Sequence, residues 1–304
     1  MIRIGVDYGG TKIEAAALDA EGRVVARVRQ PNPGDYDGGL RTVGLVVDEI
    51  ERQAGPCPRV GVATPGSVSP RTGMIRNGNS VWLNGRPFGQ DLQRTLGRPV
   101  RLANDANCLA LSEASDGAAA GQGVVFAAIL GTGVGAGVVA GGRLIEGRNG
   151  VTGEWGHMPL PWPAGVDELP PLDCWCGLKG CIETYVSGTG LARDHERTTG
   201  VRLTAEQVVA AGRGGDVEAG ATLDRYVGRL ARAFAVIVDV LDPDVIVLGG
   251  GMSNVEALYE RLPAAIAPMI FSDLFETPIV KALHGDSSGV RGAAWLWPLD
   301  EAGP

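Results

Sequence analysis

Apolar residues recur along the chain in short runs that end in glycine-rich turns, with longer amphipathic stretches between them. The run Ile2–Asp7 is largely apolar, which is typical of a buried strand. Further strands are predicted at Glu14–Leu18, Arg23–Arg29, Arg59–Ala63, Val100–Ala103, Val124–Leu130, Ala136–Ala140 and Val245–Leu248. Helices are predicted at Thr42–Gln53, Cys108 to about Asp116, Ala219–Val240, Val255–Met269 and Val290–Trp297. This alternation indicates an α/β protein.

The pattern of the first strands repeats later in the chain. The strand Val124–Leu130 leads into a glycine-rich turn and then into a second strand, as the opening of the chain does about 125 residues earlier. The repeat predicts an internal duplication with two α/β lobes. We expect a small lobe over residues 1–117, completed by a C-terminal helix at about 290–304. A large lobe over residues 118–289 would carry a cysteine-rich insertion.

Composition narrows the class of protein. The 304 residues are 44% hydrophobic, enough for a substantial core. Lys plus Arg is 27 and Asp plus Glu is 35, a net charge of −8, which lacks the basic footprint of a nucleic-acid binder. The chain has neither a signal-peptide pattern nor about 18 consecutive apolar residues. We therefore expect a cytoplasmic protein without a nucleic-acid or membrane partner, in which five cysteines do not form a disulfide framework.

A turn with the sequence Asp-Tyr-Gly-Gly-Thr-Lys follows the first strand. Gly9 and Gly10 let consecutive backbone N–H groups approach phosphate oxygens. Thr11 and Lys12 add a hydroxyl and a cation. Asp7 suits a water bound to Mg²⁺, which prefers carboxylate and water around nucleotide phosphates. Taken alone, the turn is equally compatible with a tight hairpin that binds nothing.

Two more glycine runs follow strands in the second half of the chain. The first contains Gly131, Thr132, Gly133 and Gly135, and repeats the design of the opening turn. Two such turns, one in each lobe, predict a nucleotide held across a cleft. The other run is Gly249, Gly250 and Gly251, whose bare backbone could lie against adenine or ribose, although it also suits an ordinary strand-to-helix turn.

These turns, with Asn104-Asp105-Ala106-Asn107, Glu154-Trp155-Gly156-His157 and a cysteine cluster at 174–181, resemble the ROK family of bacterial sugar kinases over essentially the whole chain. The resemblance implies the two-lobed, duplicated actin-like ATPase (RNase H-like) fold with an interlobe cleft. It also implies an ATP-dependent kinase that uses Mg²⁺ and phosphorylates the 6-position of a free hexose. Segments 79–85 and 284–292 look most like the fructokinase or mannofructokinase branch, so we expect fructose as the substrate, with mannose or glucose as further ones.

Asp105 is the expected general base, because a carboxylate at a strand end suits deprotonation of the attacking hydroxyl. The other interpretation of Asn104 and Asp105 is a helix N-cap, and the resemblance favours the base. The same resemblance assigns contacts with the sugar to Gly66, Asn79, Asn104, Asp105, Glu154, His157 and Glu183. Without it, Glu183 would be an ordinary carboxylate in the first turn of a helix.

Cys174, Cys176 and Cys181 have the spacing of a metal knuckle. Three thiolates need a fourth ligand to complete a tetrahedral zinc site, and His157 is the natural candidate. The resemblance implies a structural Zn²⁺ that holds the loop of His157 and the helix of Glu183.

Other members of the family define the alternatives. Met158 follows His157, as in N-acetylglucosamine kinases, where fructokinase-like members tend to have Asn. An N-acetylglucosamine kinase or a glucokinase is therefore the alternative enzyme. A sugar-responsive repressor of the same family is disfavoured, because a DNA-binding domain would precede the first strand, which here begins at Ile2. Whether the protein is a monomer or a homodimer is left open.

Overall fold

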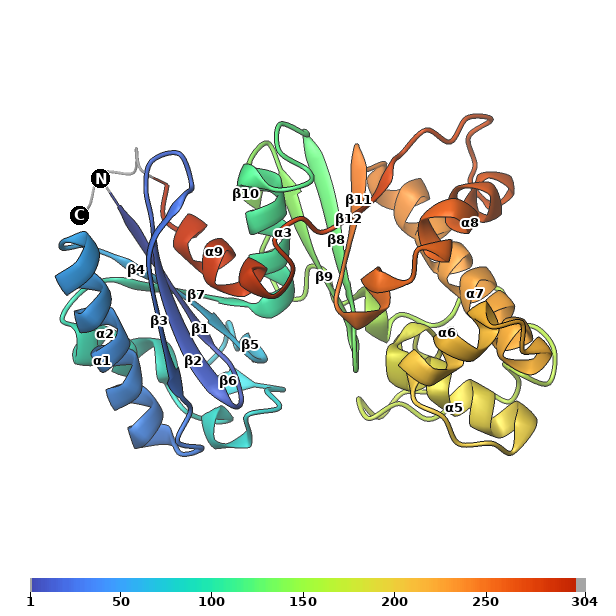
Figure 1. Ribbon diagram of the computed structural model, residues 1–304, viewed down its shortest axis with the longest axis horizontal. Helices are drawn as coiled ribbons and strands as arrows, with labels where there is room; N and C mark the ends of the chain where they lie inside the picture. The colour runs from blue at the N-terminus through green and yellow to red at the C-terminus, as the bar shows by residue number, and fades with distance from the viewer. Residues whose placement is uncertain (1, 299–304) are drawn as a thin grey trace. The chain divides into compact units, whose positions relative to one another are not determined.

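The computed structural model describes residues 2–298, which group into two compact units (Figure 1). Unit 1 consists of the chain up to Gly121, Gly142–Thr152 and the part from His284 onward. Unit 2 consists of Gln122–Gly141 and Gly153–Leu283. The lobe boundaries expected from the sequence, 1–117 with 290–304 and 118–289, stay a prediction, and residues 299–304 lie outside the described part.

Unit 1 is a sheet covered by helices on both faces. Its strands have the order β3-β2-β1-β4-β7, in which β1–β3 are antiparallel and β4 and β7 run parallel to β1. The strands are β1 (Arg3–Tyr8), β2 (Lys12–Leu18), β3 (Val24–Pro31), β4 (Val60–Thr64) and β7 (Val100–Asn104). Helices α1 (Tyr36–Ala54) and α2 (Phe88–Leu96) pack together beside the sheet, while α3 (Asp105–Asp116) packs on α9 (Ser288–Trp295). The unit also contains β5 (Ser67–Val68), β6 (Ile75–Arg76), β10 (Arg143–Leu144), η1 (Val81–Leu83) and η5 (Gly285–Ser287).

Unit 2 repeats this arrangement. Its strands β9-β8-β11-β12 consist of an antiparallel pair followed by two parallel strands, as β2-β1-β4-β7 do in unit 1. The strands are β8 (Val124–Leu130), β9 (Val134–Ala140), β11 (Val245–Gly249) and β12 (Ile279–Lys281). The helices are α4 (Glu183–Val186), α5 (Gly188–Thr199), α6 (Ala205–Arg213), α7 (Val217–Leu241) and α8 (Ala257–Ile266), with the short turns η2 (Trp155–His157), η3 (Gly251–Asn254) and η4 (Ala267–Met269). The shared strand order supports the internal duplication predicted from the sequence.

Each unit has a hydrophobic core of its own. In unit 2, Trp155 stacks on Phe234 of α7 with ring centroids 5.1 Å apart, and Phe126 of β8 meets Trp155 edge-on. In unit 1, Tyr8 at the end of β1 packs edge-on against Phe88 of α2. Burial of large apolar side chains is the dominant favourable term in folding, so each core supplies its unit with its own source of stability.

Several helix boundaries differ from the predicted ones. Helix α1 begins at Tyr36, six residues before the predicted start, because Asp35 caps it by accepting a hydrogen bond from the Gly38 N–H at 2.7 Å. Glycines in the first turn hid this start, and Gly39 is there because a Cβ would fall 2.0 Å from the Tyr8 hydroxyl. The helix predicted over 255–269 is interrupted after Ile266, where Pro268 lies at the start of η4. The last helix runs over Ser288–Trp295 and ends two residues before its predicted end at Trp297.

Helices α2, α5 and α6 are absent from the prediction. Each is short, between 9 and 12 residues. Each buries only one or two large apolar side chains, namely Phe88 and Leu92 in α2, Leu191 in α5 and Val208 in α6. So few positions give only a weak apolar periodicity. Among the described residues, no helix is both long and apolar enough to cross a membrane.

Candidate functional site

The first glycine turn joins β1 to β2, and Asp7 stands at its start. Burial raises the pKa of Asp7 to about 6, and the nearby carboxylates of Glu14 and Asp105 add to this effect. Helix α9 approaches so closely that a Cβ on Gly289 would lie 2.9 Å from an Asp7 carboxylate oxygen. Asp7 is thus a crowded acid that a cation would favour in its charged form.

Within this turn the glycines are required for different reasons. A Cβ on Gly9 would lie 2.9 Å from the Lys12 carbonyl oxygen, so Gly9 serves the turn itself. A Cβ on Gly10 would meet nothing closer than the Ser80 hydroxyl at 3.7 Å, so protein packing does not require glycine there. The Lys12 ammonium nitrogen lies 3.8 Å from a carboxylate oxygen of Glu14. Glu14 is buried and also pairs with Arg27 and Arg29. Gly10 is therefore the glycine whose bare backbone is free to serve a ligand.

Asn104 and Asp105 could each be a helix cap or a chemical group by sequence, and the structure gives them different roles. Asn104 is the N-cap of α3, and its side-chain oxygen accepts a hydrogen bond from the Asn107 N–H at 2.8 Å. Asp105 is the first residue of α3, and its carboxylate accepts a hydrogen bond from the adjacent Ala106 N–H at 2.9 Å. Although Asp105 is exposed, the protein around its carboxyl removes enough water to raise its pKa above the ordinary value. Asp105 is therefore a solvent-accessible carboxylate that the helix does not need as a cap.

Gly66 and Asn79 lie on the segment that follows β4. Gly66 has φ +78°, and a Cβ there would fall 2.4 Å from the Arg76 carbonyl oxygen. Its glycine is thus explained by packing against the 76–78 backbone, whatever else it contacts. Asn79 is exposed and directly precedes Ser80, whose buried hydroxyl has no hydrogen-bond partner.

Glu154 and His157 are brought against strand β9 by glycines. A Cβ on Gly153 would lie 1.9 Å from the Ala136 carbonyl oxygen, and one on Gly156 would lie 2.5 Å from the Val134 carbonyl oxygen. Only glycine permits so close an approach of two backbones. The Glu-Trp-Gly-His segment therefore lies directly on the strand that begins after the second glycine turn.

Glu183 links the second glycine turn to the cysteine loop. One carboxylate oxygen accepts a hydrogen bond from the Val134 N–H at 2.8 Å, and the other accepts from the Trp175 indole N–H at 2.6 Å. A Cβ on Gly133 would lie 2.6 Å from the first of these oxygens. The sequence indicated neither contact, because Trp175 and Val134 are 8 and 49 residues from Glu183.

His157, Cys174, Cys176 and Cys181 form one cluster. Their ligand atoms all lie within 4.8 Å of one another. The sulfurs of Cys176 and Cys181 are 3.6 Å apart, and the Cys174 sulfur is 3.7 Å from Nδ1 of His157. Zn–S and Zn–N bonds of roughly 2.3 and 2.0 Å at tetrahedral angles give separations of this size. The four residues thus fit a zinc ion, as the sequence predicted for this ligand set.

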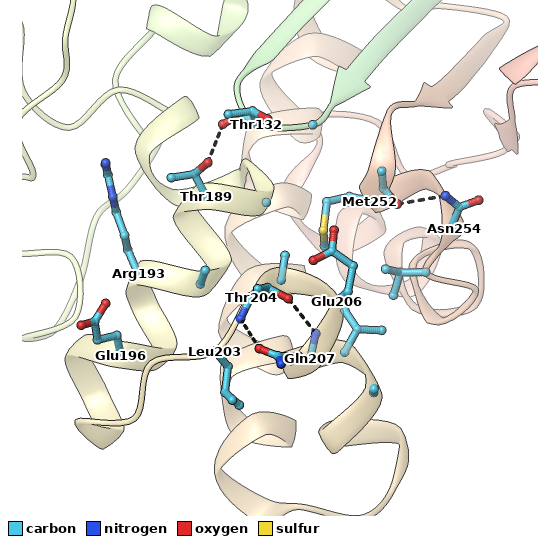
Figure 2. Close-up of a pocket in the computed structure, with 18 of the residues that line it drawn as sticks. Thr132, Thr189, Arg193, Glu196, Leu203, Thr204, Glu206, Gln207, Met252 and Asn254 are labelled. Atoms are coloured by element: carbon cyan, nitrogen blue, oxygen red, sulfur yellow. Dashed lines mark hydrogen bonds between the residues drawn. The ribbon is translucent and has the colours of Figure 1, made fainter. Parts of the chain in front are cut away.

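A cavity of about 860 Å³ lies within unit 2, between α5, α6 and η3 (Figure 2). Its lining includes Gly131, Thr132 and Gly251, from two of the predicted glycine runs. The Thr189 hydroxyl of α5 donates to the Thr132 carbonyl oxygen at 2.9 Å and ties the turn to the cavity wall, as Figure 2 shows. Sequence reasoning missed this wall together with the helices that form it, and capping by Thr204 and Gln207 was the signal that could have revealed α6.

In the third glycine run, 249–251, the three glycines differ in their surroundings. Gly249 ends β11 in the core. Gly250 has φ +78°, and a Cβ there would lie 2.6 Å from the Leu130 carbonyl oxygen. A Cβ on Gly251 would meet no atom within 4 Å, and this residue lines the cavity. Only Gly251 therefore presents its backbone to the cavity without a packing reason of its own.

The sequence model of the ROK family matches residues 3–299. The chain belongs to the ROK family. It is 40% identical to the N-acetyl-D-glucosamine kinase of Pectobacterium atrosepticum, over 97% of this chain and 99% of that protein. The ROK hexokinase of Thermus thermophilus has the same fold with a TM-score of 0.87, at 33% identity and 97% coverage of both chains. The ROK glucokinase of Streptomyces griseus, solved with glucose and AMPPNP, has a TM-score of 0.76 at 27% identity, over 97% of this chain and 99% of that one.

These relatives confirm the predicted ROK membership and the two-lobed actin-like ATPase fold, and they support a sugar kinase. The preference for fructose is wrong. Relatives about 40% identical over nearly the whole chain are N-acetyl-D-glucosamine kinases, so the fructokinase branch is not supported. The segments at 79–85 and 284–292 misled the prediction, and Met158 was the better indication.

Proposed function

We propose that this protein is an ATP-dependent N-acetyl-D-glucosamine kinase that phosphorylates the 6-hydroxyl of the free sugar. The observation that carries the proposal is the 40% identity to an N-acetyl-D-glucosamine kinase over 97% of the chain. Met158 beside His157 agrees with it, because the family resemblance associates Met at this position with N-acetylglucosamine kinases.

In the proposed reaction, the cavity of unit 2 takes the base and ribose of ATP. Its lining joins a glycine turn to apolar and polar side chains, among them Met252, Val255 and Gln207. A site for a nucleotide needs this combination, since the base is apolar on its faces and polar at its edge. The Gly131 N–H donates to the Gly133 carbonyl oxygen at 3.0 Å and closes the turn. The backbone N–H groups of Thr132 and Gly133 would bind phosphate oxygens, and Gly10 in unit 1 would offer its backbone in the same way.

Asp105 would act as the general base. Phosphoryl transfer depends mainly on positioning and charge neutralisation, with one group that orients and deprotonates the attacking hydroxyl. The carboxylate of Asp105 is exposed, and because desolvation raises its pKa it is a stronger base than an ordinary aspartate. Because the Asn104 oxygen is used by the helix cap, its amide nitrogen is the group left to donate to a sugar hydroxyl.

Two metal ions belong to the proposal. Mg²⁺ would neutralise the phosphates, and Asp7 would hold it, directly or through water, which removes the cost of keeping this crowded carboxylate charged. Zn²⁺ would be bound by the cluster of His157 and the three cysteines, and its role would be structural. By fixing the cysteine loop, it would set the places of His157 and Glu183, which with Glu154 are proposed to contact the sugar.

The test is an ADP-release assay on purified protein with ATP and Mg²⁺. N-acetylglucosamine, glucose, mannose and fructose are each titrated to obtain kcat/KM. We expect the highest value for N-acetylglucosamine, by at least tenfold, a difference that needs only about 1.4 kcal/mol of transition-state binding. A higher kcat/KM for glucose or another hexose would overturn the proposed substrate. An Asp105→Asn control separates true turnover from contaminating kinases.

A further inference from the structure

Trp175 makes contacts that its place in the sequence does not explain. It stands between Cys174 and Cys176, two of the proposed zinc ligands, and its side chain is 66% exposed. Its indole N–H nevertheless donates to a Glu183 carboxylate oxygen at 2.6 Å. Its ring also meets the His157 ring edge-on, with centroids 5.0 Å apart and planes at 84°. Trp175 therefore touches two residues that are proposed to bind the sugar.

The second oxygen of Glu183 is held from the opposite side. It accepts the Val134 N–H at 2.8 Å, and the turn at Gly133 closes on the same oxygen. A free glutamate side chain samples several rotamers and loses them when it binds a ligand. Held at both oxygens, this carboxylate has its orientation set before a sugar arrives. A carboxylate has about four acceptor positions, so two remain for sugar hydroxyls.

We propose that Trp175 is a positioning residue of the sugar site, which acts through Glu183. The two flanking zinc ligands fix its backbone, and the indole N–H then fixes the carboxylate. The role rests on the proposed function only in that Glu183 binds the sugar, and it holds for any hexose that the enzyme accepts. Preorganisation of one flexible side chain is worth roughly a 3- to 10-fold change in affinity.

The test replaces the N–H donor and keeps an aromatic ring. Trp175→Phe is expected to raise the sugar KM about 3- to 10-fold, while the KM for ATP and kcat stay close to the wild-type values. Trp162→Phe is the matched control, because Trp162 is also an exposed tryptophan of unit 2, at 57% exposure. Zinc content should be equal in all three proteins, since neither indole is a metal ligand.

Intrinsic fluorescence supplies a readout independent of turnover. Titration with the preferred sugar should change tryptophan emission in the wild type and in Trp162→Phe, and the change should be lost in Trp175→Phe. An unchanged sugar KM together with an unchanged emission response in Trp175→Phe would overturn the inference. If the wild type prefers a hexose other than N-acetylglucosamine, the proposed substrate fails, but a raised KM for that hexose still supports Trp175. If no sugar is phosphorylated, the proposed function fails, and the fluorescence titration alone decides whether Trp175 acts at a sugar site.

Discussion

Neighbouring residues in this protein carry separable tasks, and Asn104 and Asp105 show this most clearly. The sequence offers both as a helix cap or as chemistry, because Asn and Asp suit either. The hydrogen bond from Asn107 makes Asn104 the cap, which leaves the Asp105 carboxylate without a structural duty. Both residues of the motif thus suit two roles, and only three-dimensional contacts show which residue has which role.

Asp105→Asn should therefore lower kcat by about 10²–10⁴ and leave thermal stability nearly unchanged, because a positioned base is worth that much. In the wild type the raised pKa of Asp105 means that kcat falls as the pH is lowered through that pKa, where the base becomes protonated. A pH–rate profile and a melting curve of both proteins test this. Asn104→Ala is the contrast, with a stability loss of about 1 kcal/mol from the lost cap. Near-normal turnover of Asp105→Asn would contradict the assignment.

Asp7 is expected to destabilise the metal-free protein. Its pKa is raised from 3.8 to about 6, so between these values the folded state holds a proton that the unfolded chain has lost. The free energy of unfolding therefore falls as the pH rises through this window, by up to about 3 kcal/mol. Asp7→Asn should remove this cost and stabilise the metal-free protein by about 1–3 kcal/mol at pH 7.5. Urea denaturation in a chelating buffer measures it. The gain should shrink as the pH approaches 4, and a gain independent of pH would refute the explanation.

At the scale of elements, the sequence predicted the longer strands well, but it missed the short strands β5, β6, β10 and β12 and several helices, for a physical reason. Strands such as β8 and β11 are buried on both faces and appear as continuous apolar runs. Helices α5 and α6 line a cavity, so much of their surface faces solvent or a ligand and the apolar stripe is thin. The elements that form the proposed nucleotide pocket were therefore the ones that the hydrophobic pattern could not reveal.

Gly250 and Gly251, at the start of η3, provide a test variant and a control variant for that pocket. Gly251→Val places its side chain in open space within the cavity, so the protein should fold normally and bind an ATP analogue about tenfold more weakly, a loss of about 1.4 kcal/mol. Sugar affinity should not change. Gly250→Val should instead lower stability, because of its positive φ and the Leu130 carbonyl oxygen at 2.6 Å. Calorimetry and thermal melts separate the two effects. Unaltered nucleotide affinity in Gly251→Val would place the nucleotide elsewhere.

At the scale of the whole molecule, the repeat of strand order in two units was foreseeable from two similar glycine turns. The substrate was not. Family membership rests on backbone-shaping residues spread along the chain, whereas the proposed sugar contacts have neighbours in space that are distant in sequence, as Glu183 and Val134 are. The motifs thus indicated the family and the kinase reaction, and they did not indicate the sugar.

Zinc removal tests how the two units depend on the metal. The proposed ligands lie within one loop region, between His157 and Cys181, whereas each unit has a separate hydrophobic core. Binding of structural zinc is worth roughly 10–16 kcal/mol in small peptides that fold only with metal. Here most of that free energy should order the loop, because the cores keep both units folded without it.

Protein stripped of zinc with a chelator, then freed of the chelator and assayed with excess Mg²⁺, should therefore have a raised sugar KM. Its melting temperature should fall, while circular dichroism shows secondary structure largely retained. Cys176→Ser should reproduce this result without a chelator. Cys57→Ser is the control, because Cys57 is buried in unit 1, distant in sequence from the cluster, and is not a proposed ligand. Elemental analysis should find about one zinc per chain in the wild type and in Cys57→Ser, as four ligands imply. A zinc-free protein with an unchanged sugar KM would separate the metal from sugar recognition. Loss of all secondary structure on chelation would contradict the prediction, since it would show that the two cores depend on the metal.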